Sequence, residues 1–378
     1  MRSGQPLRNP LLDALRDAIG PGGCPLVPLA GSAVWLRPSS EVDVPQVDLL
    51  EGLHLRYGVL ATELRLLTDG LDEAARTFRV GVGNGPDLAL RLAAGDPRPV
   101  TYLVPLHLRD SGVDAVVAPL PTMTGEAFVK VDGLTWSLYP FVDGADGWTH
   151  GMDEQDWHNL GSALRAVHDV PPADAVVPRE AFDVTRYDGL TAWNAASRQV
   201  GPDDPRRDFA AVWQEHEPTA GAMLDQMRVL APLLRRRPRQ DVLCHGDLHP
   251  GNLLIGADGI HIIDWGDVLL APRERDFIYV PDDGTAEDAQ VLASSFFRGY
   301  GLRQAQVDWP TLAYYRCERV VQDVIGWAET VLGANEMDGA EVERAVHWLR
   351  MVFVPGDDVA GAQAACRRLP ADLDVISG

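Results

Sequence analysis

Cysteine is scarce in this chain of 378 residues, and the four present form no Cys-x-x-Cys pair. They are Cys24, Cys244, Cys317 and Cys366. Their spacing predicts neither a zinc ribbon nor a disulfide framework. Uninterrupted apolar runs of membrane-spanning length are also lacking, and residues 1–20 carry charges through their apolar part, unlike a signal peptide. We therefore expect a cytoplasmic protein with reduced thiols.

Positive charge is the second shortage. The chain has 33 Lys and Arg residues against 55 Asp and Glu residues, which gives a net charge of −22 and a pI near 4.7. Nucleic acids and anionic membranes are bound by basic surfaces, so we expect neither as a partner. An acidic protein is compatible with steering a cationic small molecule. The alternative is that the surface acids serve solubility alone.

Apolar residues make up 46% of the chain, enough for two lobes with a substantial core. Residues 1–33 end in a Gly- and Pro-rich segment and are expected to be an extension with one short helix. Residues 34–136 are mostly strand-like, with helical patterns near 45–57 and 99–109. Asp132-Gly133 lies between alternating apolar residues and predicts a β-hairpin.

The second half of the chain has mainly helical patterns. The spacing of Trp157, Leu160, Leu164 and Val167 predicts an amphipathic helix. Further helices are expected at 206–236, 285–300, 309–332, 338–353 and 357–368, with short strands between the first two of these. The fold class is therefore α+β, with a small antiparallel sheet lobe at 34–136 and a larger helical lobe at 143–378.

Polar side chains crowd between apolar strands in CHGDLHPGNLLIGADGIHIIDWGD, residues 244–267. Asp247 and Asn252 are five positions apart on one loop, and Asp264 ends a strand twelve positions later. A hairpin would bring Asn252 and Asp264 together as oxygen ligands for Mg²⁺ on a triphosphate. Asp247 would then accept a proton from an attacking hydroxyl, as in kinase-type phosphoryl transfer. The alternative interpretation is a polar turn with a structural role alone.

The motifs HGDLHPGN and IIDWGD resemble those of the aminoglycoside phosphotransferase family, small-molecule kinases with a protein-kinase-like fold. LLAPRERDFIYV resembles the segment that follows the metal-binding Asp in that family. YYRCERVVQDVIGWAE resembles a helix of its spectinomycin-phosphotransferase-like branch. LTDGLDEAARTFRV resembles the strands that cover the nucleotide, and WSLYPFVDG resembles the hinge, which the resemblance places at 137–142.

The resemblance implies a role for each matched residue of the loop. Asp247 corresponds to the catalytic base, and Asn252 and Asp264 correspond to the ligands of Mg²⁺. His245 and Asp276 correspond to residues that brace the catalytic loop by hydrogen bonds.

On the nucleotide side, backbone groups of Ser137, Leu138 and Tyr139 are expected to bind the adenine of ATP, and GTP is not excluded. Trp136 and Tyr139 are expected to add walls to that site. The family's third strand normally supplies a Lys to the phosphates, whereas LALRL has Arg91 there. The following helix offers no Glu as a partner. Arg keeps the charge and can bind phosphate through two donors, but it does not replace Lys in every respect.

The acceptor site is expected on the helix at 309–332. Arg319 and Asp323 are spaced as a simple i, i+4 ion pair. In the resembled branch, however, this helix lines the acceptor site, where Asp323 and Trp327 would suit a cationic aminocyclitol through charge and cation–π attraction. The segment 182–199 offers further candidate walls. They are Asp183, Tyr187 and Trp193.

Together these features predict ATP-dependent O-phosphorylation of a small cationic molecule by a monomer or homodimer. An aminoglycoside or aminocyclitol such as spectinomycin is the first expectation. A metabolite kinase acting on choline, homoserine, methylthioribose or a fructosyl amine keeps the chemistry and changes the acceptor. A nucleotide-binding pseudokinase is the third interpretation, and only Arg91 and the missing Glu favour it.

Overall fold

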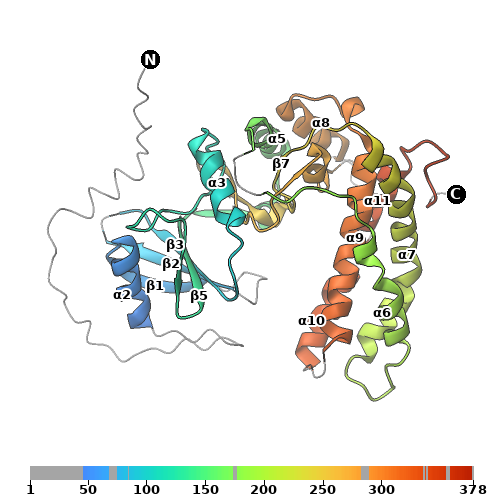
Figure 1. Cartoon of the computed structure of the whole chain (residues 1–378), viewed down its shortest axis with the longest axis horizontal. Coiled ribbons are helices and arrows are strands. Elements are labelled where there is room, and N and C mark those ends of the chain that lie inside the picture. The colour runs from blue at the N-terminus through green and yellow to red at the C-terminus, as the bar shows by residue number, and fades with distance from the viewer. Residues whose placement is uncertain are drawn as a thin grey trace. The chain divides into compact units, whose positions relative to one another are not determined.

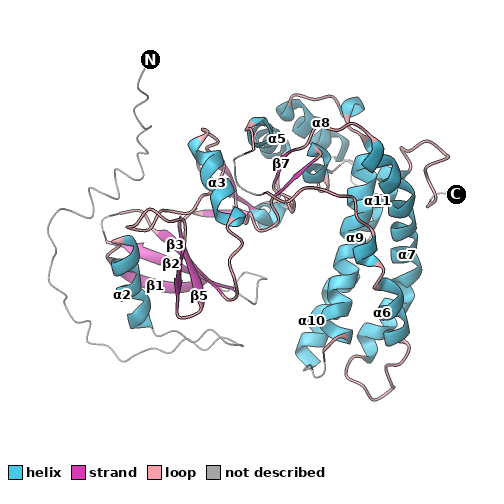
Figure 2. Cartoon of the chain, in the orientation of Figure 1, coloured by secondary structure: helices cyan, strands magenta, loops and turns pink. Residues whose placement is uncertain are grey.

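The structure, a computed structural model, describes residues 46–67, 75–83, 85–172, 177–281, 289–334, 337, 339–354 and 358–376. The predicted extension at 1–33 lies outside them. The chain divides into two compact units, Met1–Gly144 with His261–Gly266, and Ala145–Ile260 with Asp267–Gly378. The five strands of the larger sheet belong to the first unit and most of the described helices to the second (Figure 2).

The first unit is built around a five-stranded antiparallel sheet of order β1-β2-β3-β5-β4 (Figure 1). The predicted hairpin joins β4 to β5, and its turn residues Asp132 and Gly133 both have positive φ, 49° and 83°. This is the turn that Asp-Gly favours in two-residue hairpins. The elements are α2 (Gln46–Tyr57), β1 (Ala61–Leu67), β2 (Ala75–Val82), β3 (Leu88–Ala93), α3 (Val100–Asp110), β4 (Val129–Val131) and β5 (Leu134–Pro140).

Strand alternation divides the sheet into an apolar face and a polar face. Leu90 of β3 and Leu138 of β5 pair in register and pack with α2 in one buried cluster. The neighbouring pair, Arg91 and Ser137, points to the opposite face. The sheet therefore uses α2 to cover its apolar side and turns Arg91 away from the core.

A later segment of the chain returns to the first unit. Ile262, at the end of β9 (Gly259–Ile262), forms a parallel bridge with Val116. Its N–H donates to the carbonyl of Ala115 over 2.7 Å, and its carbonyl accepts from the N–H of Val117 over 3.0 Å. The sequence pattern did not predict this pairing, which places His261–Gly266 in the first unit.

The second unit has the expected helices, and it also has two short ones, at Gly147–His150 and Leu190–Ser197, that the sequence pattern did not predict. In chain order they are α4 (Gly147–His150), α5 (Glu154–Asp169), α6 (Leu190–Ser197), α7 (Arg207–Arg236), α8 (Ala289–Tyr300), α9 (Trp309–Leu332), α10 (Gly339–Met351) and α11 (Asp358–Cys366). Helices α7 and α11 pack along α9 (Figure 1). The predicted amphipathic helix at 157–167 is confirmed as part of α5, which begins with a capping box between Asp153 and Asp156.

Short strands carry the polar stretch that the sequence singled out. β7 (Val242–Cys244) pairs antiparallel with β10 (Leu269–Ala271). A three-stranded sheet has the order β6-β8-β9, where β6 is Gly144–Asp146 and β8 is Leu253–Gly256. Two single-turn 3₁₀ helices follow β7 and β10, at Pro250–Asn252 and Arg273–Phe277. The predicted strands and the turn between β8 and β9 are thus confirmed.

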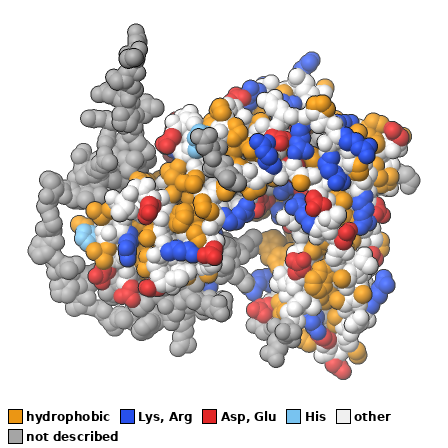
Figure 3. All heavy atoms as spheres, in the orientation of Figure 1, with side chains coloured by type: hydrophobic (Ala, Val, Ile, Leu, Met, Phe, Trp, Pro, Cys, Tyr) orange, Lys and Arg blue, Asp and Glu red, His pale blue; other side chains and the backbone are white. Residues whose placement is uncertain are grey.

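Charged side chains are spread over the helical unit. On the face drawn in Figure 3, Lys and Arg side chains are interspersed with Asp and Glu, so the charge excess is not gathered in a single patch there. Among the described residues, no helix combines the length and the apolar character needed to cross a membrane.

Candidate functional site

The loop after β7 is held by one buried carboxylate. Asp276 accepts hydrogen bonds from the backbone N–H groups of His245 and Gly246, each over 2.8 Å. Nε2 of His168, on α5, lies 3.0 Å from Oδ2 of Asp276. Burial opposes ionisation of Asp276, yet the hydrogen bond and charge of His168 and the N–H of Gly246 hold the pKa of Asp276 below its ordinary value. The loop therefore starts from a fixed anion.

Gly246 allows the loop to turn tightly before Asp247. Its φ is +88°, a conformation that L-residues rarely adopt. A Cβ at this position would lie 2.2 Å from the carbonyl oxygen of Asp267, so a side chain has no room. Both facts explain the glycine of the His-Gly-Asp motif.

Asn252 is tied to Asp247 within the same loop. Its Nδ2 donates to the backbone carbonyl of Asp247 over 2.8 Å. Because the amide nitrogen is used in this way, the amide oxygen is the group that Asn252 can offer to a cation. The side chain of Asp247 is 26% exposed, enough to meet a second molecule.

Arg319 of α9 contacts the carboxylate of Asp247. One guanidinium nitrogen, Nη1, donates to Oδ1 of Asp247 over 2.8 Å. Nε of Arg319 also forms an ion pair with Oδ2 of Asp323 at 2.9 Å. The i, i+4 ion pair considered from the sequence is therefore present. The link to Asp247 was missed, because the two residues are 72 positions apart and no local pattern relates them.

Aromatic rings surround His249, the histidine that follows Asp247 by two positions. The imidazole stacks on Trp148 with centroids 4.6 Å apart and meets Tyr279 edge-on at 5.8 Å. Its Nε2 lies 3.7 Å from Oδ2 of Asp247. Trp148 is 58% exposed although its ring covers the loop. Sequence reasoning missed Trp148, which lies in no recognised motif, and did not single out Tyr279 within LLAPRERDFIYV.

Arg91 and Tyr139 lie in the first unit, on the face of the sheet opposite α2. Burial raises the pKa of Tyr139 to about 12, while the nearby charge of Arg91 lowers it and that of Asp264 raises it. The pKa of Tyr102, on α3, is raised by burial and responds to the same two charges. Both tyrosines therefore lie within electrostatic reach of Arg91 and Asp264. Tyr102 belongs to the helix in which the sequence offers no Glu, and its position was not predicted.

Asp264 has an unusual backbone conformation. Its φ is +58°, one of three positive values among the described non-glycine residues, and its side chain is exposed. Such a conformation costs of order 1–3 kcal/mol and persists where the surrounding structure imposes it, often at functional sites. The pairing of Ile262 with the segment after α3 fixes the strand that leads into it.

The residues expected to bind adenine lie on β5. Trp136 was expected to form a wall for adenine, and this is wrong because strand alternation puts its ring in the α2 cluster, 2% exposed. Ser137, Leu138 and Tyr139 lie inside β5, and the carbonyl of Leu138 already accepts from the N–H of Leu120. Adenine recognition by their backbone groups stays a prediction.

Of the five residues expected at the acceptor site, one is linked to Asp247. Asp323 meets Asp247 through Arg319. Tyr187 was expected to be a wall, and this is wrong because its ring is in the core, 5% exposed. The exposed Asp183 accepts from the backbone and hydroxyl of Thr185, so it closes a local turn. The remaining two pack partly buried against the core cluster. They are Trp193 and Trp327.

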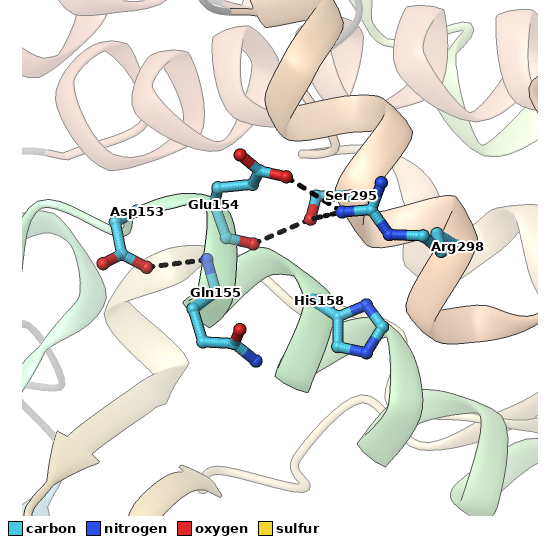
Figure 4. Close-up of a pocket in the computed structure, with 6 residues that line it drawn as sticks. All are labelled: Asp153, Glu154, Gln155, His158, Ser295 and Arg298. Carbon is cyan, nitrogen blue, oxygen red and sulfur yellow. Dashed lines mark hydrogen bonds and ion pairs between the residues drawn. The ribbon is translucent and has the colours of Figure 1, made fainter.

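A surface hollow at the start of α5 contains none of the predicted residues (Figure 4). Glu154 pairs with Arg298 over 2.9 Å, and the hydroxyl of Ser295 donates to the carbonyl of Glu154. Asp153 caps the helix by accepting from the N–H of Gln155. These side chains are engaged with one another, so we assign the hollow a structural role in joining α5 to α8.

Sequence comparisons relate this chain to a known protein family and to two known proteins. The model of a phosphotransferase enzyme family, APH, matches residues 66–315. Protein StrN of Streptomyces griseus is 29% identical over 220 residues, covering 54% of this chain and 66% of that protein. An aminoglycoside 3'-phosphotransferase of Streptomyces fradiae is 30% identical over 200 residues, covering 48% and 65%. The chain thus matches slightly less than two thirds of the length of each relative.

Among solved structures, spectinomycin phosphotransferase APH(9)-Ia in complex with ADP and spectinomycin is similar to this chain with a TM-score of 0.76. The two are 23% identical, and the match covers 84% of this chain and 98% of that one. At this identity the similarity shows the fold. The protein-kinase-like α+β fold expected from the sequence is confirmed.

Proposed function

Because this chain belongs to the phosphotransferase enzyme family, we propose that it transfers the γ-phosphate of ATP to a hydroxyl of a small cationic molecule. The observation that carries the proposal is the loop at 245–252. Asp276 fixes its backbone, Asn252 binds the carbonyl of Asp247, and the carboxylate of Asp247 remains partly exposed. This is the arrangement that a positioned general base requires.

The donor groups on this chain fit Mg²⁺, which prefers oxygen ligands and keeps several waters. Asn252 has its amide nitrogen engaged and its oxygen to offer. Asp264 has an exposed carboxylate on a backbone of positive φ. We propose that these two residues hold the metal, which would neutralise charge on the triphosphate when bound.

In the proposed reaction the acceptor hydroxyl attacks the γ-phosphorus in line. Its oxygen forms the new bond to phosphorus while the bond from phosphorus to the bridging oxygen of ADP breaks. Asp247 takes the hydroxyl proton, and Arg91 offsets negative charge on the phosphates. Positioning and electrostatics supply most of the rate enhancement in such transfers.

The charges near Asp247 support a cationic acceptor. Burial lowers the pKa of Arg319, but the negative charges of Asp323, Asp247 and Asp358 raise it. Carboxylates close to the proposed base suit an acceptor that carries amines. The exposed ring of Trp148 adds a surface suited to cation–π contact. We therefore propose an aminoglycoside or aminocyclitol, with spectinomycin first, as the substrate class.

Further parts of the proposal rest on the sequence alone. They are a nucleotide-covering lobe at 34–136 and an acceptor-binding helical lobe at 143–378, with a hinge at 137–142. They also include a cytoplasmic location, a monomeric or homodimeric state, and ATP in preference to GTP.

The test is ADP release from Mg²⁺–ATP with a panel of acceptors. Spectinomycin-type aminocyclitols head the panel, followed by deoxystreptamine aminoglycosides, choline and small sugars. Stimulation by an aminocyclitol supports the proposal, and stimulation by choline alone moves it to a metabolite kinase. Silence across the panel, with ATP still raising the melting temperature, would favour the pseudokinase interpretation.

A further inference from the structure

We propose that Arg319 is a positioning residue for Asp247, holding one carboxylate oxygen so that the other faces the acceptor hydroxyl. This inference deepens the proposed function and rests on it. It concerns a residue that no motif of the loop contains.

Arg319 makes distinct contacts with two carboxylates. Nη1 donates to Oδ1 of Asp247 over 2.8 Å, and Nε pairs with Oδ2 of Asp323 at 2.9 Å. The guanidinium carbon also lies 5.8 Å from the ring centroid of Tyr279. A planar guanidinium held on an edge and a face is more rigid than an ammonium group at the same place. Asp323 and Tyr279 therefore limit where Arg319 can hold Asp247.

The residue before Arg319 holds the residue before Asp247. Glu318 is fully buried and pairs with Nη1 of Arg275 over 2.6 Å. Nε of Arg275 in turn donates to the carbonyl of Gly246 over 3.0 Å. Consecutive residues of α9 thus fix consecutive residues of the loop. One contact reaches the backbone through Arg275, and the other reaches the side chain of Asp247 directly.

The consequence for catalysis is geometric. With Oδ1 of Asp247 held, rotation of the carboxylate is restricted and Oδ2 is the oxygen left to receive the acceptor proton. His249 lies near that oxygen, with Nε2 at 3.7 Å, beyond hydrogen-bonding distance. Without Arg319 the carboxylate would rotate among several orientations. Misplacement of a reacting group by about 1 Å can lower a rate about 100-fold.

The first experiment replaces Arg319 in the full chain. We expect Arg319→Gln to lower kcat for the best acceptor about 100-fold, with little change in the KM for ATP. Arg319→Lys should fall between, because an ammonium cannot bridge both carboxylates in the same way. Arg165→Gln is the matched control, since Arg165 and Asp169 form an exposed i, i+4 ion pair on α5. This control should keep the wild-type kcat.

The second experiment asks whether Arg319 acts through Asp247. If it does, adding Arg319→Gln to Asp247→Asn should lower kcat little further, because the group that it positions is already lost. A merely structural role predicts that the two losses multiply. Should Arg319→Gln fold poorly by its melting temperature, Asp323→Asn serves instead, since it loosens Arg319 without removing it.

The outcomes distinguish the positioning role of Arg319 from the proposed function. A large loss in the single variant that disappears in the Asp247→Asn background supports the positioning role. An active wild type, an inactive Asp247→Asn and an unchanged Arg319→Gln would overturn this inference while leaving the proposed function in place. A wild type that transfers no phosphate to any acceptor or to water would overturn the proposed function, and the inference with it.

Discussion

The side-chain amide of Asn252 donates to the backbone carbonyl of Asp247 over 2.8 Å. One contact therefore joins the residue proposed as a metal ligand to the residue proposed as the base. It means that the orientation of the amide and the path of the loop depend on each other.

Because of this link, two substitutions of Asn252 should affect kcat and the Mg²⁺ dependence differently. Asn252→Asp keeps an oxygen for Mg²⁺ but loses the donor to Asp247, so we expect a lower kcat with the dependence on Mg²⁺ concentration largely kept. Asn252→Leu loses both groups and should also raise the Mg²⁺ concentration needed for half-maximal rate. Initial rates over a range of Mg²⁺ concentrations would measure both. Identical Mg²⁺ curves for Asn252→Leu and wild type would contradict the assignment of Asn252 as a ligand.

Gly246 should tolerate no side chain. Gly246→Ala meets the carbonyl of Asp267 and also strains a φ of +88°, so we expect lower stability and a lower kcat. Gly112→Ala is the matched control, with a φ of +90° and nothing within 4 Å of the added Cβ. It separates the backbone cost, about 1 kcal/mol, from the steric clash. Equal melting temperatures for the two variants would show that the loop can move to accept the side chain.

Asp276 should make stability depend on pH. Burial raises the pKa of Asp276, but the hydrogen bond and charge of His168 lower it, and the folded-state pKa lies below the ordinary value. A lowered pKa contributes stability above the unfolded-state pKa, and that contribution is lost as pH falls through the lowered value. Asp276→Asn cannot accept both backbone N–H groups, so we expect a loss of about 2 kcal/mol near neutral pH. Urea unfolding from pH 7 to pH 3 should show the difference from wild type shrinking in acid; a constant difference would argue against an ionised Asp276.

Arg91 tests whether a guanidinium serves in place of the usual Lys. It faces away from the core, beside Ser137 in register, and its charge acts on Tyr102 and Tyr139. We expect Arg91→Met to raise the KM for ATP about tenfold or more through loss of a charged phosphate contact, and Arg91→Lys to raise it less. Steady-state rates at varied ATP would measure this. An Arg91→Lys variant with a higher kcat than wild type would show that Arg91 limits the activity of this chain.

The local features of this protein can be predicted from its sequence. The turn at Asp132-Gly133, the strands around the loop at 245–252 and the amphipathic helix α9 follow from short-range periodicity and turn chemistry. The motifs HGDLHPGN and IIDWGD carried the resemblance to the family, and Asp247, Asn252 and Asp264 all lie on that one short stretch of chain. Such features depend on residues only a few positions apart, so the sequence displays them directly.

Contacts between residues far apart in the chain depend on how the elements pack. Strand alternation shows that Trp136 and Ser137 face opposite sides, but only the packing of α2 decided which side is buried. The contact of Arg319 with Asp247 depends on how α9 packs beside the loop, across 72 positions of chain. These contacts form where the apolar faces of separate elements pack together. Because the hydrophobic effect is non-directional, a local sequence pattern does not show which two faces will pack.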